Sequence, residues 1–71
     1  MQSKRTKIGK IKKYNGYTGE IVSLGGIYYF TRNDIVGDER LQIDDIVIFN
    51  GRTEDKFPQA YYIKKAVIKR K

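Results

Sequence analysis

The chain has 71 residues, enough for one domain, and it carries 15 lysines and arginines against 8 aspartates and glutamates, for a net charge of +7. It has no cysteine and no histidine, which excludes disulfides, thiolate zinc sites, cysteine nucleophiles and the commonest general base. Because an extracellular domain of this size would normally need disulfides, we expect a cytoplasmic protein. No segment approaches the ~18 apolar residues of a membrane-spanning helix, so we expect no membrane partner.

The first predicted strand spans residues 7–14. Ile11 and Tyr14 are three positions apart, so both reach a core only if a β-bulge lies between them. Such a bulge would leave Lys12 and Lys13 pointing outward.

Two further strands are predicted at residues 20–24 and 27–31. Gly25-Gly26 is a strong signal for a two-residue hairpin turn between them. A turn at these glycines pairs Val22 with Tyr29 across the hairpin.

The second half of the chain begins with the polar, irregular segment 32–45, in which Ile35 and Leu41 are the expected inward anchors. Strands follow at residues 46–50 and 60–65. Five short strands rich in Ile, Val and Tyr, at regular spacing and with no amphipathic helix, predict a small closed all-β barrel.

The positive charge is concentrated at the ends of the chain. Residues 1–14 and 64–71 hold eleven of the basic side chains and none of the acidic ones. This segregation favours a surface that faces a polyanion, and solvated basic tails are the alternative. We expect a single domain over residues 1–71, with frayed basic tails at 1–6 and 66–71.

Four stretches of the chain carry a resemblance to a known family. They are GKIKKYN (9–15), IYYFTRNDI (27–35), LQIDDIVIF (41–49) and FPQAYYIKK (57–65). In order and approximate spacing they resemble the cold-shock domain, whose motifs include G-K-V-K-W-F-N, L-x-x-G-D-x-V-x-F and G-P-Q-A-x-x-V. The resemblance implies a five-stranded antiparallel OB-type barrel that binds single-stranded RNA or DNA. An S1-like or SH3-like barrel remains an alternative of similar composition.

The chain departs from this family pattern at the positions where aromatic rings are expected. Lys13 stands where the family has a tryptophan, and Glu20 and Val22 replace two exposed aromatics of the second strand. Thr31 and Arg32 replace a histidine and the aromatic after it. The resemblance therefore implies a binding surface with less stacking and more charge.

The resemblance places Tyr29 on the exposed face of the third strand, where bases stack, and places Tyr28 and Phe30 inside the barrel. A base stacked on such a ring gains about 1–3 kcal/mol with little dependence on sequence. The alternative is that Tyr29 covers Val22 across the hairpin, as aromatic and β-branched pairs do in sheets.

The expected site combines rings with basic side chains that bind phosphates and give salt-dependent affinity. An arginine there binds phosphate or stacks on a base. Glu20 lies on the same expected face, where it would repel phosphate, and this counts against the interpretation. The nucleic-acid-binding residues are expected to be Lys10, Lys12, Lys13, Tyr29, Arg32 and Lys56. Further stacking is assigned to Tyr17, Phe57 and Tyr62 if they face the groove, with partial burial as the alternative.

The sequence predicts no catalytic residue, metal site or cofactor. Adjacent acids such as Asp44 and Asp45 point apart on an extended chain, so they fit a turn better than a pair of carboxylates for general acid-base catalysis. We expect a monomeric, weakly binding nucleic-acid module with no small-molecule substrate. The alternative is a protein-interaction or structural OB module that has lost nucleic-acid binding. It would form a dimer or bind a protein through an apolar patch of Val22, Ile46 and Ile48, with Tyr29 or Tyr61.

Overall fold

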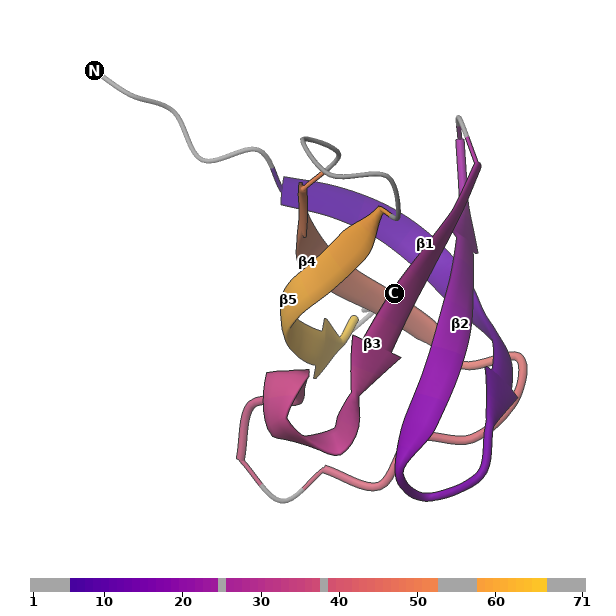
Figure 1. Cartoon of the computed structure of the whole chain (residues 1–71), viewed down its shortest axis with the longest axis vertical. Coiled ribbons are helices and arrows are strands. Elements are labelled where there is room, and N and C mark those ends of the chain that lie inside the picture. The colour runs from indigo at the N-terminus through magenta and orange to yellow at the C-terminus, as the bar shows by residue number, and fades with distance from the viewer. Residues whose placement is uncertain (1–5, 25, 38, 53–57, 67–71) are drawn as a thin grey trace, which may run out of the picture.

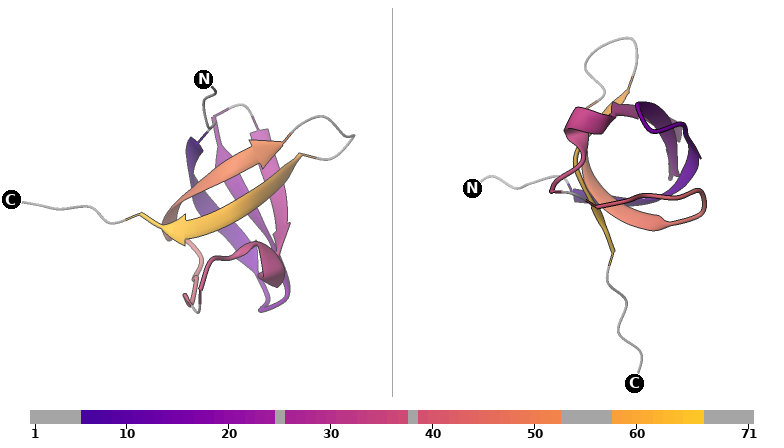
Figure 2. Two further views of the ribbon diagram at one scale, coloured as in Figure 1. Left: turned by 90° about the vertical axis from the view of Figure 1, so that its left-hand side faces the viewer. Right: turned by 90° about the horizontal axis from the view of Figure 1, so that it is seen from below.

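The structure is a computed structural model that describes residues 6–24, 26–37, 39–52 and 58–66. Its strands close into a barrel in the order β1-β2-β3-β5-β4 (Figures 1 and 2). All pairings are antiparallel except the short parallel contact between β3 and β5. This is the small five-stranded OB-type barrel that the sequence predicts. The elements are β1 (Thr6–Tyr14), β2 (Thr18–Ser23), β3 (Gly26–Thr31), the 3-10 turn η1 (Arg32–Asp34), β4 (Ile46–Arg52) and β5 (Gln59–Lys65).

The core fills the interior of the ring that Figure 2 shows end-on. Alternate strand positions point inward, which buries Val47 and Phe49 of β4, and the burial of Leu41 confirms it as a predicted loop anchor. Aromatic rings pack edge-on or tilted, with centroids 5.2 Å apart for Tyr28 and Phe49. The buried side chains are Ile11, Ile21, Tyr28, Phe30, Leu41, Val47, Phe49, Ala60 and Ile63, with Tyr14 and Ile35 packed against them.

The predicted bulge in β1 is confirmed. Ile11 pairs with Ile21 on β2, but the next pair is Lys13 with Glu20, so Lys12 is the extra residue. The bulge lets Tyr14 turn back to the core, where its ring lies 5.4 Å from that of Phe30.

The predicted register of the β2–β3 hairpin is wrong. Ser23 pairs with Gly26, so residues 24 and 25 make the connection in place of Gly25-Gly26. Glu20 therefore lies opposite Tyr29, where Val22 was expected. The observed register sets Gly19 against Phe30, and a Cβ atom at Gly19 would lie only 2.5 Å from the Phe30 ring. The bulk of that ring thus selects the glycine as its partner and moves the turn.

The turn before β2 is formed by Asn15 and Gly16. Gly16 has φ +98°, and the Asn15 side-chain oxygen accepts hydrogen bonds from the backbone N–H groups of Tyr17 and Thr18 at 2.8 and 3.0 Å. This loop is therefore closed by its own side chain.

The long segment between β3 and β4 is tied to β1 near its end. Asp45 accepts from the Gln42 N–H at 2.8 Å, and Asp44 has φ +79°, which confirms the turn role predicted for these acids. The backbone C=O of Asp45 accepts from the Ile11 N–H, and the Asp44 N–H donates to the Ile11 C=O, at 2.9 and 2.8 Å. The loop thus lies alongside the first strand.

Two residues that were assigned to the predicted tails, Thr6 and Ala66, are bonded to the barrel. Thr6 begins β1, and the Ala66 N–H donates to the Ile46 C=O at 2.9 Å. The remaining tail residues, 1–5 and 67–71, lie outside the described residues. In the part of the chain that the structure describes, no helix is long and apolar enough to cross a membrane.

Candidate nucleic-acid interface

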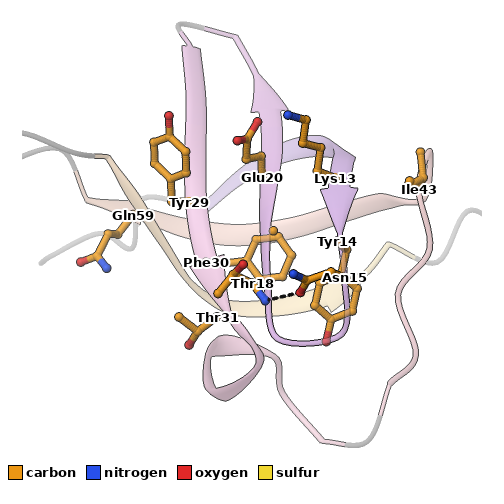
Figure 3. Close-up of a pocket in the computed structure, with 11 residues that line it drawn as sticks. Lys13, Tyr14, Asn15, Thr18, Glu20, Tyr29, Phe30, Thr31, Ile43 and Gln59 are labelled. Atoms are coloured by element: carbon orange, nitrogen blue, oxygen red, sulfur yellow. Dashed lines mark hydrogen bonds between the residues drawn. The ribbon is translucent and has the colours of Figure 1, made fainter.

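A groove of about 430 Å³ lies on the outer surface of the barrel over the first three strands (Figure 3). Its lining includes the core ring of Phe30 and the ring of Tyr14, which packs against the core. The lining residues come from β1, β2, β3, the start of β5 and two loops. They are Lys13, Tyr14, Asn15, Thr18, Gly19, Glu20, Tyr29, Phe30, Thr31, Ile43 and Gln59.

Four of these residues form one row across neighbouring strands. Lys13 pairs with Glu20, Glu20 with Tyr29, and Tyr29 with Gln59. Adjacent strands in a sheet are about 4.8 Å apart, so these four residues are direct neighbours along the backbone pairing. Figure 3 shows Tyr29, Glu20 and Lys13 standing on the same side of their strands. We call these four residues the cross-strand row.

The Tyr29 ring faces outward because its neighbours are anchored inside. Tyr28 and Phe30 are 5% and 2% exposed, whereas Tyr29 is 42% exposed. The Tyr29 N–H donates to the Pro58 C=O at 3.0 Å, which fixes the strand against the start of β5. This confirms the expected division of the three aromatic residues between core and surface.

Exposed lysines follow one another along β1, and one of them lines the groove. Lys10, Lys12 and Lys13 are exposed, and Lys10 pairs with Val22 on β2 and with Ile46 on β4. Lys13 faces outward because the bulge places it opposite Glu20. The structure therefore places Lys13 in the groove with Tyr29, with Glu20 between them, whereas Lys10 and Lys12 do not line it.

Glu20 is half-buried at the centre of the cross-strand row. Among the residues that the structure describes, its carboxylate forms no ion pair and no side-chain hydrogen bond. The ion pair found in that part of the chain joins Lys65 to Asp45 at 3.8 Å, outside the groove. Both oxygens of Glu20 are thus left to accept hydrogen bonds from solvent or a ligand.

The other candidate residues lie outside this groove. Arg32, in η1, lines a second, polar hollow of about 870 Å³ with Glu39 and Arg40. Tyr17 is 70% exposed, and its C=O accepts from the Arg32 N–H at 2.8 Å, so these two candidates lie close together.

Tyr62 belongs to a different face of the barrel. Its ring is 69% exposed, its φ is +53°, and it lines hollows with Asn50 and Ile48 of β4. The remaining candidates, Lys56 and Phe57, lie outside the described residues.

Of the expected binding residues that the structure describes, only Lys13 and Tyr29 line the groove, and sequence reasoning missed several of its side chains, Ile43 and Gln59 among them. Ile43, 58% exposed, is brought there by the backbone hydrogen bonds between the long loop and Ile11, for which the sequence has no local signal. Gln59 lies within the quoted FPQAYYIKK stretch, but its parallel pairing with Tyr29 joins residues far apart in the chain.

The described residues contain no group of three acidic side chains placed to hold a metal ion. A scan against protein-family models finds no match, and a search of curated proteins finds no relative. The fold is thus an OB-type barrel on the strength of its strand order, while the cold-shock resemblance rests on the four sequence stretches alone.

Proposed function

We propose that this chain is a non-catalytic module of cold-shock type that binds single-stranded RNA or DNA. The observation that carries the proposal is the exposed ring of Tyr29, held on the outer wall of an OB-type barrel in one groove with Lys13 of β1. A ring of this kind offers a face to any base, and the lysines offer charge to the phosphates that flank it.

The arrangement favours weak binding dominated by electrostatics. Tyr29 is the one aromatic residue of the cross-strand row, so stacking contributes about 1–3 kcal/mol at one base. The rest of the affinity comes from phosphate contacts, which carry no sequence information and weaken as salt rises. We expect a cytoplasmic monomer that binds single-stranded nucleic acid without catalysing a reaction and without a cofactor.

The test is a titration of a fluorescent eight-nucleotide oligouridine, followed by anisotropy at low and at physiological salt. Tyr29→Ala should weaken binding roughly 5- to 150-fold, the equivalent of about 1–3 kcal/mol. Tyr62→Ala is the control, since it removes a more exposed tyrosine from another face of the barrel and should change affinity less than about twofold. Equal effects of the two substitutions would remove the basis for this proposal.

A second candidate function is protein interaction, which the exposed apolar side chains favour. Ile8 is 64% exposed and pairs with half-buried Ile48 across β1 and β4, and Val22 is 41% exposed. Light scattering separates the two proposals. A mass that rises with concentration toward twice 8.3 kDa supports self-association, and a constant monomer mass contradicts it.

A further inference from the structure

The position of Glu20 needs an explanation of its own. A carboxylate repels phosphate, yet Glu20 stands at the centre of the cross-strand row, between a lysine and the exposed ring. Its oxygens have no partner among the described residues. An acceptor held in this way on a binding surface favours a ligand group that donates hydrogen bonds.

The charge of Glu20 determines which part of a nucleic-acid strand can lie over the cross-strand row. Phosphates are repelled from it and attracted to the exposed lysines of β1, Lys13 included, so we expect bases rather than phosphates to lie over Tyr29. Directly opposite residues in a sheet have Cβ atoms about 4.5–5.5 Å apart. A base stacked on the ring of Tyr29 therefore brings one edge within hydrogen-bonding reach of the Glu20 carboxylate.

The four bases differ in what their edges offer to a carboxylate. In a single strand the Watson–Crick edge is open to side chains. Guanine presents two adjacent donors there, N1–H and the 2-amino group, which match the two oxygens of a carboxylate. Adenine and cytosine present one donor next to an acceptor nitrogen, and uracil presents one donor flanked by two carbonyl oxygens. Paired charge-assisted hydrogen bonds are stronger and more selective than single ones.

We propose that Glu20 is a specificity-determining residue that selects guanine at the base position stacked on Tyr29. The inference rests on the proposed function and adds a base preference to it. Lys13, the neighbour of Glu20 on the side away from Tyr29, lies where it would hold a phosphate next to the selected base.

The experiment uses uridine heptamers that carry guanosine, inosine or adenosine at the central position. All three are purines of similar size, so stacking on Tyr29 is nearly constant, and a single guanosine avoids guanine-rich structures. The native protein should bind the guanosine heptamer about tenfold more tightly than the adenosine heptamer, within the range of one well-formed bidentate contact. Inosine lacks the 2-amino group and should fall between them.

Two variants that each remove one negative charge test which residue recognises the base. Glu20→Gln should reduce the preference for guanosine over adenosine to less than about twofold, and it should strengthen binding of an all-uridine heptamer because a negative charge is gone. Glu39→Gln removes the same charge from the second hollow and should leave the preference intact.

The outcomes separate this inference from the proposed function. If the native protein binds the guanosine and adenosine heptamers equally while Tyr29→Ala weakens both, the inference is overturned and the proposed function stands. A guanosine preference that survives in Glu20→Gln also overturns it, because another group must then read the base. If no heptamer binds, both proposals are overturned.

Discussion

The substitution Gly19→Ala tests how the groove is built. A Cβ atom at this position would lie 2.4 Å from the backbone oxygen of Lys13 and 2.5 Å from the ring of Phe30. Neither neighbour moves easily, because the first is backbone at the β1 bulge and the second is a core ring only 2% exposed. To reach even 3.0 Å, the strands must separate by about 0.6 Å, an overpacking strain of about 1–3 kcal/mol.

For a domain of this length, that loss corresponds to a fall in Tm of about 4–8 °C for each kcal/mol. Thermal unfolding followed by circular dichroism measures it. Ser23→Ala, on the same strand, is the control. It removes one hydrogen bond, from the Ser23 hydroxyl to the Ile8 C=O at 2.8 Å, and should cost about 0.5–1.5 kcal/mol. If Gly19→Ala melts at the native temperature, the close packing of β1, β2 and Phe30 described above is incorrect.

Two further predictions concern charge and the turn. Lys13→Ala should reduce the slope of log K against log salt by about 0.7, the contribution of one phosphate contact on a single strand, whereas Lys64→Ala, on β5 opposite Ile48, should leave it unchanged. Binding isotherms at four salt concentrations measure the slope, and an equal change in both variants would contradict the assignment of Lys13. Asn15→Ala should destabilise the fold by about 1 kcal/mol because two backbone N–H groups lose their acceptor. Asn15→Asp keeps that acceptor and should melt close to the native protein; if it melts as low as Asn15→Ala, the turn hydrogen bonds are not the cause.

Local patterns in the sequence predict most of the barrel. The three-residue spacing of Ile11 and Tyr14 required a bulge, and the alternation at Val47 and Phe49 fixed which side chains face the core. These predictions succeed because side-chain direction along a strand follows from period two alone. The outward position of Tyr29 follows from the same rule once its neighbours are buried.

Features that depend on pairing between strands were harder to predict. The Gly25-Gly26 signal placed the hairpin turn one residue too late, because the fit of Phe30 against Gly19 outweighs local turn preference. The error concealed the pairing of Glu20 with Tyr29, on which the proposed base preference depends. Ile43 likewise enters the groove through hydrogen bonds between a loop and β1, which no local pattern encodes.

The most direct test of nucleic-acid binding is an amide NMR titration of the labelled protein with a short oligouridine at low and at physiological salt. Binding at the groove predicts chemical-shift changes that centre on Lys13, Glu20 and Tyr29 and persist at physiological salt. Changes confined to the basic ends of the chain and lost as salt is raised, or no changes at all, would contradict the proposed site.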